Sequence, residues 1–216
     1  LAEALRRAGY KTGLFGKWHL GAHFDHGPTE QGFDEFIGLR GGFIDNYNHY
    51  FLHGDGFHDL YDGKQEIFAR GEYFPDIITG RALEFIDKNR RNPFLLAVAL
   101  NIPHYPEQAD GKFDRRYRDL KMPRRSYAKM ISTTDDRMGT IMARLEQHGL
   151  QETTIVVFMS DNGHSEENYK IRGESHASGL AEGTNYGANG GGGNTGKWLG
   201  RKGTFLEGGI RVPAII

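Results

Sequence analysis

Lys17 and His19 stand two residues apart in the apolar segment FGKWHLG, residues 15–21. Side chains two apart on an extended chain point to the same face, so a strand here would direct an ammonium group and an imidazole toward one point. Such a pair suits the binding of an anion. A solvated lysine beside a structural histidine explains the same residue types, so the pair needs support from the rest of the chain.

Asp161 and Asn162 come directly after the apolar run TTIVVFM at 153–159. Their carboxylate and amide oxygens are hard ligands of the kind that suit Ca²⁺ or Mg²⁺ better than Zn²⁺. Such ions take about six or more oxygens, so two donors are only part of a site. The residues SDNG also favour a turn, and an Asx turn is the alternative interpretation. His164 follows closely and is a candidate for lining the same pocket.

Three helix-like stretches are each followed by an apolar run and then by a polar cluster. The stretches are 1–8, 75–93 and 124–148, and the runs are 10–15, 94–100 and 153–159. This alternation predicts an α/β fold in which helices sandwich a mostly parallel sheet. Ligands of such sheets bind beyond the carboxyl ends of the strands. By that rule, one set of side chains should lie together at a single edge of the sheet: Lys17, His19, His104, Asp161 and Asn162.

Two segments interrupt the alternation, about 22–74 and 166–200. We expect both to be long irregular insertions near the site, because long loops inside compact domains are often functional. The second contains the glycine run GANGGGGNTG, which is expected to be a surface loop. The histidines of the first, His53 among them, are expected to be surface or structural groups, and Asp135 with Asp136 to lie on a helix surface.

The composition excludes several classes of function. Lys and Arg number 27 against 28 Asp and Glu, so bulk charge gives no reason to expect nucleic-acid or membrane-surface binding. No apolar run approaches the about 20 residues of a membrane span. The absence of cysteine excludes disulfides, thiolate metal sites and a cysteine nucleophile within these residues. Both ends resemble cut elements, so we expect 1–216 to be part of a single larger domain.

Five segments together resemble the successive motifs of the sulfatase family. In chain order they are GKWHLG (16–21), GPTEQGFDEFIG (27–38), NPFLLAVALNIPHYP (92–106), TTIVVFMSDNG (153–163) and RKGTFLEGGIRVP (201–213). The resemblance implies an alkaline-phosphatase-like α/β fold, in agreement with the alternation of helices and strands. It also implies that 1–216 belongs to a sulfatase catalytic domain.

The resemblance implies roles for the candidate residues. Lys17 and Lys202 would bind sulfate oxygens, and His19 would hydrogen-bond the nucleophile. His104 would contact sulfate and protonate the leaving oxygen, His164 would lie in the substrate pocket, and the pair at 161–162 would bind the metal. The family's nucleophile is a formylglycine made from Cys or Ser in a C/S-x-P-x-R motif, which these residues do not contain. We therefore expect this chain by itself to be inactive.

The expected function of the intact protein is hydrolysis of an aryl or carbohydrate sulfate ester. Ca²⁺ or Mg²⁺ and formylglycine are the implied cofactors, and the formylglycine-generating enzyme is an implied partner. Two alternatives remain: a phosphate or phosphonate monoester hydrolase of the same superfamily, and a non-catalytic relative that only binds sulfate esters. The resemblance implies a periplasmic, secreted or lysosomal location.

Overall fold

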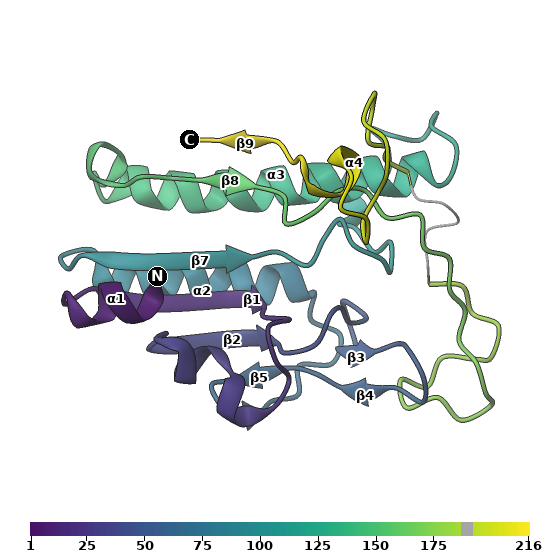
Figure 1. The fold of residues 1–216 in the computed structure, drawn as a ribbon, viewed down its shortest axis with the longest axis horizontal. Helices are drawn as coiled ribbons and strands as arrows, with labels where there is room; N and C mark the ends of the chain where they lie inside the picture. The colour runs from purple at the N-terminus through teal and green to yellow at the C-terminus, as the bar shows by residue number, and fades with distance from the viewer. Residues whose placement is uncertain (187–191) are drawn as a thin grey trace.

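A five-stranded sheet with the strand order β6-β5-β2-β1-β7 forms the centre of the protein in a computed structural model that describes residues 1–186 and 192–216 (Figure 1). Its strands are β1 (Lys11–Lys17), β2 (Glu35–Leu39), β5 (Tyr61–Asp62), β6 (Gln65–Glu66) and β7 (Phe94–Ala99). β1 runs parallel to β2 on one side and to β7 on the other, whereas β5 and β6 extend the sheet in antiparallel fashion. The predicted α/β class is confirmed.

The three parallel strands end at the same edge of the sheet. Gly16 of β1 is in register with Ala99 of β7, and Lys17 is in register with Leu39 of β2. The backbone ladder continues one step further, because the His19 N–H donates to the Arg40 carbonyl at 3.2 Å. The segments that follow β1, β2 and β7 therefore leave the sheet side by side.

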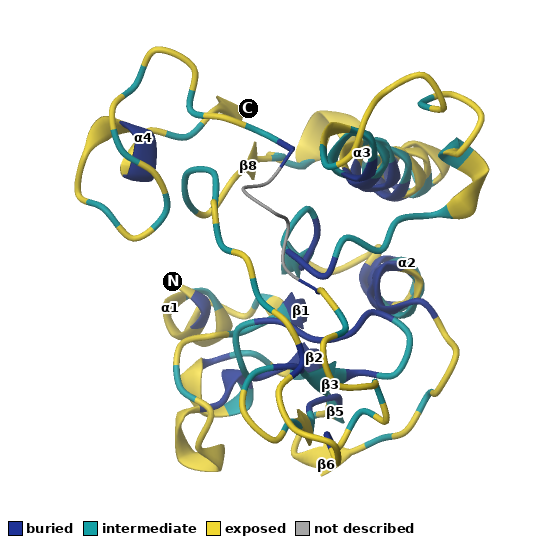
Figure 2. Cartoon of the chain, turned by 90° about the vertical axis from the view of Figure 1, so that its right-hand side faces the viewer, coloured by how far each residue is buried: buried dark blue, intermediate teal, exposed yellow. Residues whose placement is uncertain are grey.

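Helices cover both faces of the sheet. α1 (Ala2–Arg7) packs on β1, and α2 (Phe74–Asn89) packs on β1 and β7 from the opposite side (Figure 2). α3 (Arg124–Gln147) packs on α2 and forms an outer layer. The main core lies between α2 and the sheet, where α2 buries residues at helical spacing. Its fully buried members include Phe15, Leu39, Phe74, Ile78, Ala82 and Ile86.

Ion pairs of the buried Arg137 side chain join the two long helices. Arg137 of α3 donates to Asp76 of α2 at 2.6 Å and to Asp110 at 2.9 Å. Asp110 precedes the short 3-10 turn η3 (Gly111–Phe113), and a second turn, η4 (Gln151–Thr153), follows α3. Asp136 pairs with Arg137 and with Lys112. Asp136 thus lies half-buried on α3 and makes local ion pairs, which confirms the expected helix-surface role.

The segment 22–74 is more regular than expected. It contains β2, β5 and β6 of the main sheet, a hairpin of β3 (Tyr50–Phe51) and β4 (Phe57–His58), and the turns η1 (Phe24–His26) and η2 (Pro28–Gln31). The prediction of a largely irregular insertion is wrong chiefly because β2 is a strand of the main sheet. The five residues of β2 are too few to show a period, and their conformation is decided by pairing with β1.

The apolar run 153–159 does not form the expected third strand of the parallel sheet. Only β8 (Phe158–Met159) is a strand, and it pairs antiparallel with β9 (Ala214–Ile215), apart from the main sheet (Figure 1). Ile155 is 85% exposed, although a doubly covered strand would bury it. A strand needs a hydrogen-bonded neighbour, and no described strand lies between this run and β7.

Two further regions complete the fold. α4 (Glu207–Ile210) is a single turn, and Gly163 donates to its Gly209 carbonyl at 2.9 Å. Part of the predicted glycine loop, 187–191, lies outside the described residues. Among the helices that are described, none is both long and apolar enough to cross a membrane.

The first test concerns Gly16, because the β7 backbone leaves no room for a side chain there. Gly16 has a φ of 121°, and a Cβ added to it would overlap the carbonyl oxygen of Ala99. We expect Gly16→Ala to lower the free energy of unfolding by about 3 kcal/mol or more. Gly139→Ala, in α3 with open space around it, should stabilise by about 0.5–1 kcal/mol. Urea denaturation of the full-length variants measures both, and an unchanged midpoint for Gly16→Ala would contradict the close approach.

Candidate active site

Lys17 is the last residue of β1 and the first charged group of the site. Its side chain is 15% exposed, and its Nζ lies 4.0 Å from Oδ2 of Asp161. Burial lowers the pKa of Lys17, the Asp161 carboxylate opposes that shift, and the positive charge of Lys202 adds to it. The structure therefore brings together three predicted site residues that are widely separated in the sequence.

His19 lies at the same edge, but not as a residue of an extended strand, which the sequence had predicted. The extended strand stops at Lys17, and His19 has a φ of 52°, so simple alternation of side chains does not apply. A Cβ added to Gly42, just beyond β2, would lie 3.1 Å from the His19 imidazole. The missing side chain at Gly42 thus leaves room for the ring. Partial burial and then the charges of Lys17 and Lys202 lower the pKa of His19.

His104 follows β7 and contacts Lys202 directly. Its Nδ1 lies 2.7 Å from the carbonyl oxygen of Tyr105, which can only accept, so Nδ1 carries the proton. Its Nε2 lies 3.0 Å from Nζ of Lys202 and accepts from that ammonium group. Burial, and then the charges of Lys202 and Lys17, lower the pKa of His104 to about 4. At neutral pH, His104 is therefore an uncharged acceptor beside a cation.

Glu167 is a member of this cluster that sequence analysis missed. Its Oε2 lies 3.0 Å from Nζ of Lys202, and the Ser165 hydroxyl donates to the same oxygen at 2.7 Å. Partial burial works to raise the pKa of Glu167, but the hydrogen bonds from Ser165 and Lys202 outweigh it and hold the pKa low. Nothing in the local pattern SEEN distinguishes Glu167 from its neighbour Glu166, so no sequence signal could have found it.

Asp161 and Asn162 form a turn at the mouth of the site. The Asn162 amide donates to Oδ1 of Asp161 at 2.6 Å, and the Asp161 side chain is 72% exposed. Their oxygens match a hard cation in kind. The described residues contain no group of three or more His, Cys, Asp or Glu side chains that could hold a metal ion. The residues of this chain thus fit part of a Ca²⁺ or Mg²⁺ site.

His164 lines the same groove as Lys17, His19, Asp161 and Asn162. Its imidazole packs edge-on against Tyr127 of α3, with ring centroids 5.9 Å apart. Its carbonyl oxygen accepts from the backbone N–H of Lys202 at 2.9 Å. The His164 backbone thus also contacts Lys202, next to the groove that His164 lines.

A groove of about 1280 Å³ runs from the site into the protein between β7, α3 and residues 154–159. Lys17, His19, Asp161 and Asn162 line its polar end, and apolar side chains such as Leu96, Ile141 and Val157 line the rest. The groove follows the edge of β7 that no described strand pairs with. The polar end of the groove is therefore continuous with a long apolar channel.

The two predicted insertions pack on each other beside His104. Phe43, Leu52 and Tyr105 form a small buried core with Ile171 and Tyr186, and Phe43 stacks on the His104 ring at 5.2 Å. His53 lies in the same cluster, 4.5 Å from the Tyr169 ring. Burial lowers the pKa of His53, and the charges of Glu167 and Lys202 act on it. His53 is thus close to the site, which its place in the sequence did not indicate.

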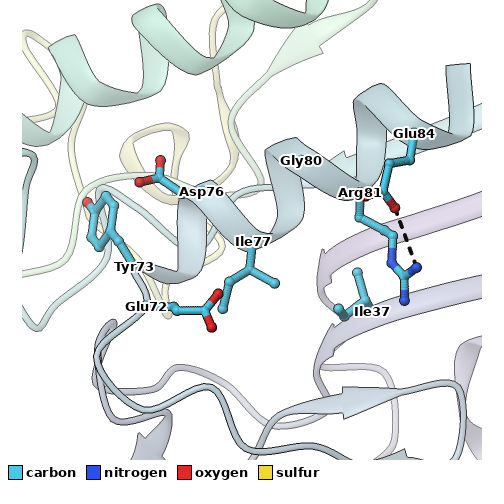
Figure 3. Close-up of a pocket in the computed structure, with 8 residues that line it drawn as sticks. All are labelled: Ile37, Glu72, Tyr73, Asp76, Ile77, Gly80, Arg81 and Glu84. Atoms are coloured by element: carbon cyan, nitrogen blue, oxygen red, sulfur yellow. Dashed lines mark ion pairs between the residues drawn. The ribbon is translucent and has the colours of Figure 1, made fainter. Parts of the chain in front are cut away.

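A second hollow, of about 470 Å³, lies beside α2 and Ile37 of β2 and contains none of the predicted site residues (Figure 3). Arg81 contacts Glu84 at 3.5 Å, and Asp76 accepts from Arg137 at 2.6 Å. Because the predicted site residues lie at the edge of the parallel strands instead, that edge is the better candidate.

The whole chain matches one family model. The model described as Sulfatase matches residues 1–216. Mouse arylsulfatase J is 31% identical over 100% of this chain and 33% of its own length. Mouse N-acetylgalactosamine-6-sulfatase is 30% identical over 100% of the chain and 39% of its length. An ulvan-active sulfatase of Formosa agariphila is 29% identical over 76% of the chain and 35% of its length. The chain thus spans between a third and two fifths of these curated relatives.

Solved structures agree with these matches. Ps i-CgsB, in a crystal structure with k-i-k-neocarrahexaose, superposes with a TM-score of 0.73 and 28% identity over 99% of this chain and 46% of that one. The PsFucS1 sulfatase from Pseudoalteromonas sp. superposes with a TM-score of 0.69 and 25% identity over 99% of this chain and 43% of that one. The chain therefore shares its fold with these proteins.

The second test asks whether the contact with Lys202 lowers the pKa of His104. Lys202→Met removes the neighbouring positive charge, so we expect the pKa of His104 to rise from about 4. Lys88→Met removes a cation that pairs with Glu35 at the opposite edge of the sheet, and it should leave His104 unchanged. NMR titration of the full-length variants, with His104→Asn to assign the signal, measures the shift. Equal pKa values in all three proteins would show that Lys202 does not act on His104.

Proposed function

The chain belongs to the sulfatase family, and from that premise we propose that the intact protein hydrolyses a sulfate ester and releases inorganic sulfate. One observation carries the proposal: Lys17 and His19 at the end of β1 and His104 after β7 lie at the carboxyl ends of parallel strands, and Lys202 lies 3.0 Å from His104. Two cations held close together repel each other, and an anion between them removes that repulsion. A sulfate group is an anion of suitable charge.

The two lysines would stabilise the negative charge on the sulfate oxygens. Positive groups that are already in place when the S–O bond breaks lower the barrier, because they need no reorganisation. Lys17 is largely buried, so its charge is less screened by water than that of a surface lysine. His19, whose pKa is lowered, would accept a hydrogen bond from the nucleophile in its neutral form.

Breaking the S–O bond leaves an electron pair on the alcohol oxygen, which then needs a proton. The prediction assigned this proton to His104, whose Nε2 is unprotonated at neutral pH when Nδ1 donates to Tyr105. We therefore assign the proton to the ammonium group of Lys202, 3.0 Å away. Lys202 would become a neutral amine as the alcohol forms, and His104 would orient its donor.

Sulfatases generally use a formylglycine nucleophile and Ca²⁺. We propose that Asp161 and Asn162 supply two of the oxygen ligands for Ca²⁺ or Mg²⁺, and that the remaining ligands and the nucleophile come from other parts of the intact protein. Such a cation, when bound, would add positive charge next to the sulfate oxygens. The formylglycine-generating enzyme would then be a required partner.

The names of the relatives include both aryl and carbohydrate sulfatases, which supports an aryl or carbohydrate sulfate ester as substrate. A phosphate ester hydrolase and a non-catalytic binding protein are the alternatives, and kinetics with matched esters distinguish them. The proposed location is periplasmic, secreted or lysosomal.

Kinetics of the full-length enzyme test the anion pocket. We expect Lys17→Ala, His19→Ala and Lys202→Ala each to lower kcat/KM for 4-nitrophenyl sulfate by about 100-fold or more. His104→Ala should cause a loss of that size for phenyl sulfate, whose leaving group needs a proton. His23→Ala, which removes a side chain that is 70% exposed, should change kcat/KM little. Faster turnover of 4-nitrophenyl phosphate than of the sulfate would favour the phosphatase alternative, and binding without turnover would favour the non-catalytic one.

Metal content tests the proposed ligands. Asp161→Ala removes a charged ligand and should lower the bound Ca²⁺ or Mg²⁺ of the full-length protein more than Asn162→Ala, which removes a neutral one. Asp135→Ala, on the exposed side of α3, should leave the content unchanged. Elemental analysis of the purified variants measures it. Equal metal in wild type and Asp161→Ala would refute the assignment.

A further inference from the structure

We propose that Glu167 is a positioning residue of the sulfatase site, which holds the Lys202 ammonium group against His104. The inference rests on the proposed function, in which Lys202 supplies the proton to the leaving alcohol. Glu167 lies outside the five segments that resemble the family motifs, in the segment 166–200 that sequence analysis treated as an insertion. Its role is therefore argued from contacts alone.

Lys202 has two partners that together define where its ammonium group lies. Its Nζ is 3.0 Å from Nε2 of His104 and 3.0 Å from Oε2 of Glu167. A lysine side chain has a flexible four-carbon stem, and one contact with a neutral imidazole would leave much of its conformational freedom. The second, charged contact restricts the ammonium group to the position that faces His104.

Glu167 is itself held by donors on both of its oxygens. The Ser165 hydroxyl donates to Oε2 at 2.7 Å, and the Tyr169 hydroxyl donates to Oε1 at 3.4 Å. Tyr169 in turn stacks on Tyr186 and contacts His53 in the aromatic cluster beside His104. The Glu167 carboxylate is therefore held by the same aromatic cluster that holds His104. Because Glu167 in turn holds Lys202, packing of this cluster sets the distance between Lys202 and His104.

The negative charge of Glu167 also offsets part of the positive charge of the site. Lys17 and Lys202 each act on the other and on both site histidines, so this edge of the sheet carries an excess of positive charge. The Glu167 carboxylate acts in the opposite sense on Lys17 and on His104. The groups that face His104 are thus Lys202, Lys17, Glu167 and the Tyr105 carbonyl. Removing the carboxylate would let the lysines repel each other more strongly.

A structural ion pair is the competing explanation, and the chain contains a matched control for it. Glu166 pairs with Arg201 at 3.3 Å, one residue before Glu167 and Lys202. The two pairs join the same two segments, but the Glu166–Arg201 pair is more exposed and contacts neither site histidine. Surface pairs of this kind contribute little to stability. If Glu167 only joined the segments, Glu166→Gln and Glu167→Gln would behave alike.

The first experiment compares two aryl sulfates on the full-length enzyme. Phenyl sulfate has a leaving group that needs a proton, whereas 4-nitrophenolate leaves readily without one. We expect Glu167→Gln to lower kcat/KM for phenyl sulfate by about 10-fold or more and for 4-nitrophenyl sulfate by no more than about 3-fold. Glu167→Asp should restore part of the loss, and Glu166→Gln should change neither substrate. Equal losses on both substrates, or no loss, would overturn the proposal.

The second experiment does not depend on turnover. In the wild type, Lys202→Met is expected to raise the pKa of His104, which NMR titration measures. In the Glu167→Gln background the same substitution should raise it by less than half as much, because Lys202 is no longer held against the ring. In the Glu166→Gln background the effect should be undiminished. An undiminished effect with Glu167→Gln would overturn the positioning role, whereas a wild type inactive toward both sulfates would refute the proposed function alone.

Discussion

The parallel pairing of β1 with β2 and β7 is the constraint on which the site depends. Because the three strands run in the same direction and in matching register, the residues after them leave the sheet at one edge. That edge receives Lys17 and His19 from β1, Gly42 from the segment after β2, and His104 from the segment after β7. A shift of one residue in register would turn the Lys17 side chain to the other face of the sheet.

Like charges held close together give this edge its chemical character. Lys17 and Lys202 each influence the other, and both lower the pKa of His19 and His104. Proteins seldom bring lysines together without compensating charge, and here two carboxylates, Asp161 and Glu167, supply part of it. The arrangement suits a tetrahedral anion because such a ligand can contact several cations at once. Histidines kept neutral beside them can accept hydrogen bonds rather than add to the repulsion.

The segments outside the regular elements support the site as a second, smaller core. Aromatic side chains of 43–58 and 169–186 pack on Tyr105, next to His104. Backbone contacts add to this packing, since Ala177 donates to the Asp55 carbonyl at 2.9 Å. Aromatic packing thus holds His104, whereas a backbone hydrogen bond to Arg40 holds His19. The chain positions its functional groups with two separate cores, one under the sheet and one beside it.

The sequence by itself determined the helices α1, α2 and α3, the strands β1 and β7, the α/β class and the family motifs. Helical periods and the glycine after α1 are local signals, and α2 and α3 begin and end within a few residues of 75–93 and 124–148. Only the tertiary structure decided that β2 joins the sheet, that 153–159 does not, and that Lys202 meets His104 and Glu167. These contacts join residues 98 and 35 positions apart. Short strands and ion pairs have no local period, because their conformation depends on partners that folding brings from elsewhere in the chain.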